Sequence, residues 1–335
     1  MKRDDKRYTQ FSLVKEMAET AFVVKNFPYD RVTGYPLDYN RVLLTGEGSS
    51  RIFPAKQLRA KALRSGFGQV FITDGATQSK EYMLDNTSVF VASNSGKTAE
   101  GVGLLKYMQE NNIKASTCAV VAHDNTPIAD MCDSKYILGC GNEEAVAATK
   151  SVVEQALFYD VLFSAKNNKP FTKGDELSEL IDKVLWTELD EDFVRMVADA
   201  PMLYFAGRND GVAEELTLKT NEITRKKSDF LEGTYAVHGI EEVMNPEETL
   251  ILIEPFVELE EKVKKALADG VGINVVAIAS RETMFPTFVI PDAGELNPYL
   301  LLVAGWNLLV EAGVRLDINL DKPQRARKIG NEFTG

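Results

Sequence analysis

A short polar stretch, Ser93-Asn94-Ser95-Gly96-Lys97-Thr98, has the residue types of an anion-binding loop. It follows the apolar run from Ser88 to Ala92 and precedes a helical pattern that extends from Thr98 to about Gln109. Where a buried strand leads into a helix, unpaired backbone N–H groups and the positive end of the helix dipole favour an anion. The hydroxyl side chains add donors, so the stretch is interpreted either as a phosphate site or as an ordinary helix cap.

Missing glycines exclude two nucleotide-binding motifs. A Walker loop needs a glycine five residues before Gly96, and Val91 stands at that position. The turn after the first predicted strand, Gly46-Glu-Gly-Ser-Ser-Arg51, lacks the third glycine of dinucleotide-binding oxidoreductases. Neither nucleoside triphosphates nor a nicotinamide cofactor is therefore expected.

Three charged residues of a predicted helix form a second candidate group. Glu215, Lys219 and Glu222 recur at helical spacing and share one face of that helix. Spacing alone favours a solvated face with an ordinary Glu–Lys pair. The chain has two histidines: His123 is expected to be a turn residue that bonds to the backbone, whereas His238 lies in an irregular segment after this helix.

The elements that must position these groups alternate between strand and helix. This alternation predicts an α/β fold with two doubly wound, flavodoxin-like parallel-sheet domains that carry helices on both faces. In such sheets ligands bind beyond the carboxyl ends of the strands, where the strand order reverses. The strands are expected at 41–45, 69–73, 88–92, 116–122, 135–138, 202–206, 249–254, 274–279 and 287–290, and the main helices at 11–27, 52–63, 79–84, 98–109, 144–163, 176–185, 212–224, 256–269 and 296–314.

The polar segment 166–174 marks the expected domain boundary. We expect residues 1–36 to form an N-terminal helix and linker, and 37–168 the first domain. The second domain, with its connecting helix, is expected at 169–317, and residues 318–335 form a C-terminal tail.

Composition limits the partners, cofactors and cellular location that we expect for this protein. The net charge of -12 argues against a nucleic-acid partner, although a small phosphorylated ligand needs only local positive potential. The three cysteines lack paired metal spacing, and Cys118, in an apolar strand, is expected to be a buried inert thiol. No His/Cys/Asp cluster has ligand spacing, so we expect no metal and no cofactor. With no signal segment and no apolar run of membrane-spanning length, a cytoplasmic protein without membrane contact is expected.

The order of these segments resembles a pair of sugar isomerase (SIS) domains. In the first half the matching segments are Gly48-Ser49-Ser50, the Ser93–Thr98 stretch and Glu143-Glu-Ala-Val-Ala-Ala-Thr-Lys150. In the second half they are Gly207-Arg208, the Glu215–Glu222 helix and His238-Gly239. The tail that ends in Lys328 resembles the C-terminus of the isomerase half of glutamine:fructose-6-phosphate aminotransferases.

The resemblance implies a role for each matching residue. Glu222 would be the base that moves a proton between C1 and C2 of a sugar phosphate, with Lys219 close by. His238, supplied by a partner subunit, would open the sugar ring, and Lys328 would approach the open-chain carbonyl. The phosphate would be held by Ser49, Ser50, Ser93, Asn94, Ser95 and Thr98, and the residues implied to lie near the substrate are Gly48, Glu143, Ala147, Ala148 and Glu215.

The function implied is that of a phosphosugar isomerase or deaminase acting on a glucosamine 6-phosphate or fructose 6-phosphate type of substrate. The alternatives are a deglycase of fructosamine 6-phosphates and a non-catalytic sugar-phosphate sensor. A homodimer, or a dimer of dimers, follows if His238 acts in a partner subunit. Because no cysteine precedes Cys118, glutamine-dependent amination by this chain alone is not expected. Four residues depart from the family pattern: Lys97, Ala148, Tyr235 and Ile240.

Overall fold

The structure is a computed structural model that describes residues 1–35, 37–325 and 332–333, and it divides into two compact units. The first-sheet unit comprises Phe22–Glu143 and Ala148–Asp175 with residues 332–333 of the tail. The second-sheet unit comprises Met1–Ala21, Glu144–Ala147 and residues 176–325. Each unit therefore includes a segment from the opposite end of the chain. The domain boundaries expected from the sequence stay predictions.

The first-sheet unit is built on five parallel strands in the order β2-β1-β3-β4-β5. Their bounds are β1 (Arg41–Gly46), β2 (Val70–Ile72), β3 (Thr87–Ser93), β4 (Ser116–Val121) and β5 (Ser134–Ile137). The helices of this part of the chain are α3 (Tyr29–Val32), η1 (Gly48–Ser50), α4 (Ile52–Ser65), α5 (Ala76–Ser79), α6 (Ala99–Glu110), α7 (Pro127–Met131) and α8 (Lys150–Lys166).

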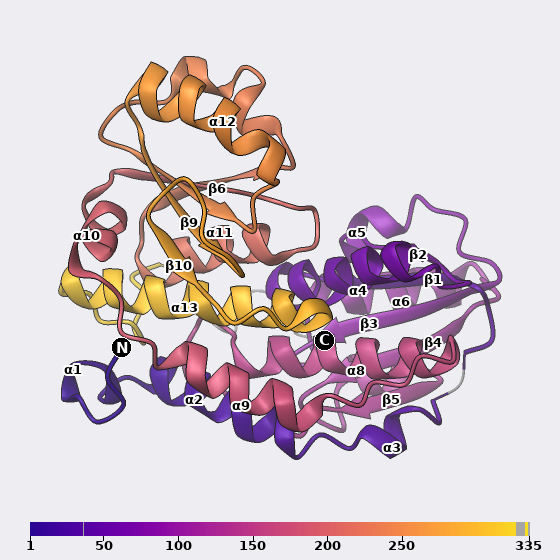
Figure 1. Cartoon of the computed structure of the whole chain (residues 1–335). Helices are drawn as coiled ribbons and strands as arrows, with labels where there is room; N and C mark the ends of the chain where they lie inside the picture. Colours follow the sequence, from indigo (N-terminus) through magenta and orange to yellow (C-terminus); the bar gives the residue numbers. More distant parts are fainter. Residues whose placement is uncertain (36, 326–331, 334–335) are drawn as a thin grey trace. The chain divides into compact units, whose positions relative to one another are not determined.

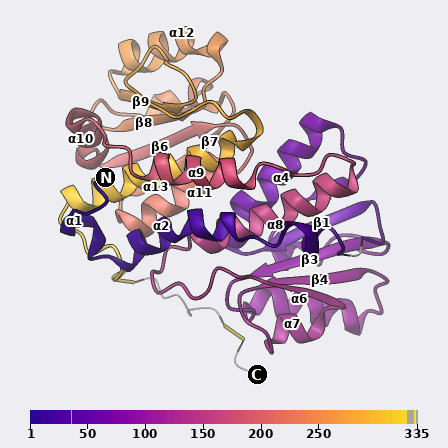
Figure 2. The ribbon, with the colours of Figure 1, turned by 60° about the horizontal axis from the view of Figure 1, so that its bottom comes forward.

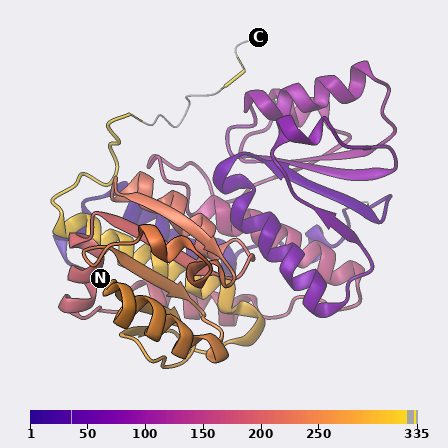
Figure 3. The ribbon, with the colours of Figure 1, turned by 90° about the horizontal axis from the view of Figure 1, so that it is seen from above.

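Strand β3 is buried along its whole length because helices cover both faces of the sheet. Successive side chains of a strand point to opposite faces. Val89 and Val91 accordingly pack among apolar residues of α6 and α7, while Phe90 contacts the rings of Phe158 and Phe163 in α8. Figure 2 shows α6 and α7 on one side of these strands and α8 on the other, and the same three layers can be followed in Figure 3.

The second-sheet unit repeats this plan with strands in the order β10-β9-β8-β6-β7. All five strands are parallel: β6 (Met202–Gly207), β7 (Lys227–Glu232), β8 (Thr249–Ile253), β9 (Asn274–Ala279) and β10 (Thr287–Val289). In this order β6, β7 and β8 hold the places that β1, β2 and β3 hold in the first sheet. The order reverses between β1 and β3 in one sheet and between β6 and β8 in the other.

Helices cover both faces of the second sheet. In Figure 1, α11 (Val212–Ile223) and α13 (Asn297–Arg315) lie on one side of the strands, and α12 (Glu260–Val263) with η5 (Lys264–Val271) lies on the other. Gly305 permits the close packing of α11 and α13, because a Cβ there would lie 2.3 Å from Leu216 Cδ2. The remaining helices of the chain are α1 (Lys6–Thr9), α2 (Ser12–Lys25), α9 (Gly174–Leu185), α10 (Glu191–Asp199), η2 (Tyr235–Val237), η3 (Ile240–Val243), η4 (Val257–Leu259) and η6 (Gly294–Leu296).

The predicted fold class is confirmed, since both sheets are parallel and covered by helices on both faces. Several local predictions were wrong. The helix expected at 144–163 begins only at Lys150, because Thr149 and Ser151 donate their backbone N–H groups to Glu143. The helix expected at 79–84 lies earlier, at α5, where Glu47 accepts the N–H of Ala76.

Besides short helices such as α1 and α3, one strand and one longer helix were missed, and one predicted helix is divided. Strand β7 (Lys227–Glu232) is an edge strand with one fully buried residue, so its polar sequence carries little apolar signal. Helix α10 was also missed, although Asp190 caps it through the N–H groups of Asp192 and Phe193. The helix expected at 256–269 is divided into η4, α12 and the π-helical η5.

Candidate functional site

The Ser93–Thr98 loop owes its shape to Gly96. This glycine has φ +67°, and a Cβ on it would lie 2.2 Å from Thr126 Oγ1. Glycine is therefore the residue that both the backbone conformation and the available space require. The loop follows β3 directly, and Gly46 of β1 pairs with Ala92 of β3. The Gly48–Ser50 turn and the Ser93–Thr98 loop consequently lie at the same edge of the sheet, at the reversal of strand order, as predicted.

The hydroxyl groups of this loop bond to one another instead of capping the next helix. Ser93 Oγ lies 2.7 Å from Thr98 Oγ1 and also accepts the N–H of Gly96 at 3.1 Å. Thr98 is the N-cap residue of α6, yet its side chain makes no capping hydrogen bond. The first N–H groups of this twelve-residue helix thus have no side-chain cap, which is the arrangement that accepts an anion.

Glu143 joins the Ser93–Thr98 loop to the start of α8. Its buried carboxylate accepts Ser151 Oγ at 2.6 Å, Thr149 N at 2.8 Å, Ser151 N at 3.2 Å and Asn94 Nδ2 at 3.2 Å. Charged acceptors make the stronger hydrogen bonds in proteins. The carboxylate thereby fixes the amide of Asn94. Sequence reasoning included Thr149 in a matching segment without giving it a role and missed Ser151, although their hydroxyl groups near the start of α8 were an available signal.

The other residues predicted to lie near the substrate, in Gly48–Ser50, at Ser95 and in Ala147–Ala148, differ in their exposure to solvent. Ser49 is buried, whereas Ser50 is half-buried and Gly48 is exposed. Ser95 is half-buried and accepts the N–H of Lys97 at 3.2 Å. Ala147 is buried and Ala148 is half-buried.

A cationic recess borders the Gly48–Ser50 turn. Arg51, Lys56 and Arg59 of α4 and its N-cap line it together with the segment from Phe71 to Asp74. Arg51 Nε and Thr73 Oγ1 are buried there without a hydrogen-bond partner. Since buried donors and acceptors are normally paired, these two atoms are available to a water molecule or to a polar ligand. The recess gives a chain of net charge -12 a local positive potential beside the turn.

The Glu215, Lys219 and Glu222 side chains meet on one face of α11, but that face is not solvated. The side chains of Lys219 and Glu215 are 0% exposed, and that of Glu222 is 20% exposed. Lys219 Nζ lies 2.8 Å from Glu222 Oε2 and 3.3 Å from Glu215 Oε1. The prediction from spacing alone, an ordinary surface pair, was therefore wrong.

Lys219 keeps its charge although it is buried. Burial acts to lower the pKa of the Lys219 ammonium, but the carboxylates of Glu222 and Glu215 outweigh that effect, so this pKa lies above its usual value. A cation so placed can hold the Glu222 carboxylate in a fixed orientation and offers positive charge to a developing oxyanion.

His238 and Lys328 complete the predicted catalytic set. His238 is exposed and directly follows η2 (Tyr235–Val237), and Gly239 after it has φ +103°. His123 is an exposed turn residue whose carbonyl accepts Thr126 Oγ1, in agreement with the turn that was expected there. Lys328 lies outside the described residues.

The cysteines show no sign of reactivity. Cys118 is buried, and burial raises the pKa of its thiol to about 11. All three cysteines are unpaired. Within residues 1–35, 37–325 and 332–333, no cluster of three or more His, Cys, Asp or Glu side chains could hold a metal ion. The described helices include none with both the length and the apolar character that a bilayer crossing requires.

Comparison with known proteins finds a family match in the first half of the chain. Residues 37–165 match the model of the SIS domain family. The chain is 27% identical to the isomerizing glutamine–fructose-6-phosphate aminotransferase of Staphylococcus aureus strain COL, with 73% of this chain and 44% of that protein covered. The enzyme of the same name from Clostridium perfringens strain 13 is 26% identical, with the same coverage. The chain thus spans less than half the length of these relatives.

Three solved structures share the fold of nearly the whole chain. The C-terminal domain of a glucosamine-fructose-6-phosphate aminotransferase from Francisella tularensis has a TM-score of 0.72 at 16% identity, with 95% of this chain and all of that chain covered. A tagatose-6-phosphate ketose/aldose isomerase from Escherichia coli has a TM-score of 0.76 at 15% identity, with 96% and 99% covered. A glucosamine-6-phosphate deaminase from Thermotoga maritima has a TM-score of 0.72 at 15% identity, with 96% and 99% covered.

Proposed function

We propose that this chain, whose residues 37–165 match the model of the SIS domain family, is an enzyme that isomerises or deaminates a phosphosugar by moving a proton between C1 and C2. The supporting observation is the buried Lys219 that holds the Glu222 carboxylate at 2.8 Å, because proton abstraction beside a carbonyl needs a positioned base and a nearby cation. The substrate we propose is of the glucosamine 6-phosphate or fructose 6-phosphate type.

The Ser93–Thr98 loop is proposed to bind the phosphate group. Its hydroxyl groups and the uncapped N–H groups of α6 supply donors, and the cationic recess beside Gly48–Ser50 attracts the anion. Glu143 holds the Asn94 amide in place for the same ligand.

The Glu222 carboxylate is proposed to take the proton from one carbon of the open-chain sugar and return it to the neighbouring carbon. Lys219 stabilises the enediol or enolamine that forms between the two transfers. In deamination, the resulting imine adds water and releases ammonia, which leaves fructose 6-phosphate. His238 of a partner subunit would move the proton that opens the sugar ring, and Lys328 would approach the carbonyl.

The test is to incubate the protein with glucosamine 6-phosphate and to follow ammonia and fructose 6-phosphate. Turnover should fall about 10²–10⁴-fold in Glu222→Gln while the variant still binds the phosphate ligand. Glu247→Gln, which changes an exposed carboxylate, is the matched control and should retain full turnover. An active Glu222→Gln enzyme would remove the role assigned to this residue.

The same assay separates the two alternatives. A 6-phosphofructosyl amino acid consumed faster than glucosamine 6-phosphate would favour a fructosamine 6-phosphate deglycase that uses the same Glu222. Thermal stabilisation by hexose phosphates without turnover of any sugar phosphate would instead favour a sensor. We place the enzyme first because the Lys219–Glu222 pair has the positioned carboxylate and nearby cation that proton abstraction beside a carbonyl needs.

A further inference from the structure

The cationic recess of the first-sheet unit is large enough to hold a ligand of its own. Arg51, Lys56 and Arg59 line it together with the segment from Phe71 to Asp74, and its volume is about 430 Å³. Sites for small molecules usually have volumes of about 300–1,000 Å³. The recess therefore has the size of a binding site for a small molecule.

The recess lies too far from the Ser93–Thr98 loop for one phosphate group to contact both. The end of β2 lines the recess, the loop follows β3, and β1 lies between these two strands. Neighbouring strands are about 4.8 Å apart, which separates the two places by about 10 Å. A phosphate group on the loop thus leaves the recess open to a second ligand.

The two arginines of the recess have no acidic partner. Neither Arg51 nor Arg59 forms an ion pair with a described carboxylate, and both side chains are half-buried. The Nε of Arg51 is buried without a hydrogen-bond partner. A charge that is partly withdrawn from water and unpaired raises the free energy of the protein, and a bound anion would lower it again.

Two carboxylates belong to the same edge of the sheet, and each accepts a hydrogen bond from another group. Asp74, which lines the recess, accepts the hydroxyl of Tyr82 at 2.7 Å. Glu47, which precedes the Gly48–Ser50 turn, accepts the N–H of Ala76 at 2.9 Å. Burial raises the pKa of the Glu47 carboxyl, and the opposing effect of Arg51 does not reverse this shift. These carboxylates therefore do not neutralise the arginines.

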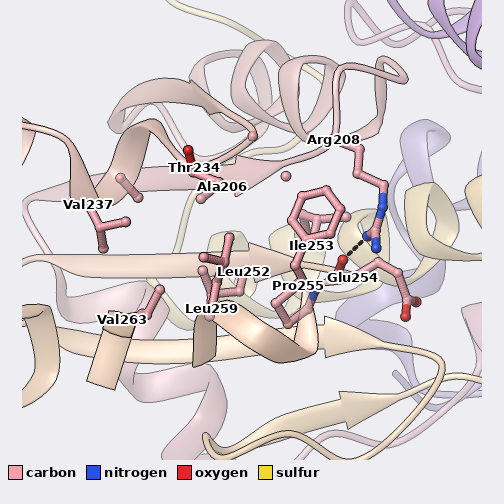
Figure 4. Close-up of a pocket in the computed structure, with 14 residues that line it drawn as sticks. Ala206, Arg208, Thr234, Val237, Leu252, Ile253, Glu254, Pro255, Leu259 and Val263 are labelled. Carbon is pink, nitrogen blue, oxygen red and sulfur yellow. Dashed lines mark hydrogen bonds between the residues drawn. The ribbon is translucent and has the colours of Figure 1, made fainter. Parts of the chain in front are cut away.

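The pocket at the carboxyl ends of β6 and β8 in the second sheet differs from the recess (Figure 4). Its volume is about 30 Å³, and most of the residues that line it are apolar. Its arginine, Arg208, donates to the main-chain carbonyl of Glu254 and lies 4.3 Å from the ring centroid of Phe256. The second sheet thus shows that an arginine at this edge can be satisfied within the protein, which Arg51 and Arg59 are not.

We propose that the cationic recess binds a ligand with a diphosphate group, at a site separate from the Ser93–Thr98 loop. A guanidinium takes phosphate oxygens in pairs, so each arginine holds one of the two phosphate groups, and Lys56 adds a third positive charge. A single phosphate or a carboxylate would leave one arginine unpaired. Inorganic pyrophosphate and a nucleoside diphosphate share this chemistry. Binding at the recess does not depend on the proposed function.

Binding is tested by calorimetry on the full chain without divalent cations, with pyrophosphate, adenosine diphosphate and orthophosphate as probes. Pyrophosphate should bind at least tenfold more tightly than orthophosphate. Tighter binding of adenosine diphosphate than of pyrophosphate would identify an organic ligand and the reverse an inorganic one, and either result supports the site. Equal binding of orthophosphate and pyrophosphate, or no binding of either diphosphate at about 10 mM, would overturn the proposal.

Variants locate the binding site. Arg51→Gln and Arg59→Gln each remove one guanidinium charge, and each should weaken pyrophosphate binding at least tenfold. Arg31→Gln, at an exposed arginine of the same unit, is the matched control and should bind as the wild type does. Unchanged binding in both recess variants would place the ligand elsewhere and refute the proposal.

The Ser93–Thr98 loop is tested separately with Ser95→Asp, which places a carboxylate in that loop. This variant should lose binding of fructose 6-phosphate, whereas pyrophosphate binding should fall less than about threefold at physiological ionic strength, because the two places are farther apart than the screening length. Loss of pyrophosphate binding in Ser95→Asp would show that the diphosphate occupies the loop, and the recess would then be no separate site.

Turnover of sugar phosphates is measured in parallel. A chain that binds pyrophosphate through Arg51 and Arg59 but turns over no sugar phosphate would refute the proposed function and leave the diphosphate site standing. A chain that turns over a sugar phosphate but binds neither diphosphate would do the reverse.

Discussion

Replacement of the buried lysine of α11 is the sharpest test of the site's electrostatics. Lys219→Met leaves the carboxylates of Glu215 and Glu222 without the ammonium that lies 3.3 Å and 2.8 Å from them. The Glu215 side chain is 0% exposed, so water cannot replace that partner. Breaking a buried ion pair from one side costs about 3–5 kcal/mol, and we expect this loss in the free energy of unfolding.

The assay is urea unfolding followed by tryptophan fluorescence. Both tryptophans of the chain, Trp186 and Trp306, belong to the second-sheet unit, which also contains Lys219. Their fluorescence therefore reports the unit that is perturbed. Lys264→Met breaks an exposed ion pair of the same unit, with Asp269 at 2.8 Å, and is the control that should leave the unfolding midpoint unchanged.

A second substitution shows whether the stability lost in Lys219→Met comes from charge or from packing. Glu215→Gln added to Lys219→Met removes one of the two carboxylate charges that the lysine faced, so about 0.5–3 kcal/mol of the lost stability should return. If the double variant is no more stable than Lys219→Met alone, the loss comes from packing and the electrostatic argument fails. It fails equally if Lys219→Met is as stable as the wild type.

The pH dependence follows from the same site. The pKa of Lys219 is raised in the folded protein, because Glu222 and Glu215 outweigh the opposing effect of burial. Its charge-dependent stabilisation is therefore complete below the unfolded value and is lost only as the pH rises through the folded value. The deficit of Lys219→Met should accordingly be constant between about pH 7 and 9.

Three further predictions concern the first-sheet unit. Gly96→Ala should cost about 1–3 kcal/mol by circular dichroism in urea, because its φ is +67° and the new Cβ would meet Thr126; a stable variant would contradict the loop geometry. Glu143→Gln should raise KM for the sugar phosphate more than it lowers kcat, since the residue positions Asn94. If steady-state kinetics instead show a larger effect on kcat than on KM, Glu143 takes part in the chemical step. Cys118 should react slowly with a disulfide reagent at neutral pH, because burial raises its pKa to about 11, and rapid labelling of the folded protein would refute that.

The strands that precede the predicted loops could be found from the sequence because their buried residues are consecutive in the chain. Every residue of β3 and of β8 is buried, and each strand therefore corresponds to a largely apolar run in the sequence. β7 gave no such signal, since an edge strand with a single buried residue can be polar and still pair with β6.

The burial of the α11 ion pair could not be predicted from the spacing of its residues. Helical periodicity places Glu215 and Lys219 on one face, but only tertiary packing decides whether that face meets water. Leu216, which follows Glu215 in α11, packs against Gly305 of α13, and such contacts between elements distant in sequence are not visible in the periodicity. Glu143 was expected near the substrate, but its hydrogen bond to Asn94 could not be predicted, because Asn94 is distant in sequence.

The exchange of segments between the two units has a consequence for how the protein folds. Residues 1–21 precede the first sheet along the chain but belong to the second-sheet unit, where Tyr8 donates to Glu311 at 2.8 Å. Residues 332–333 follow the second sheet along the chain, yet Phe333 donates its N–H to the carbonyl of Lys97 at 2.8 Å, within the Ser93–Thr98 loop of the first-sheet unit. Neither unit is complete in a chain cut at the middle. The two halves should therefore refold together and co-purify, and each half produced by itself should be only marginally stable.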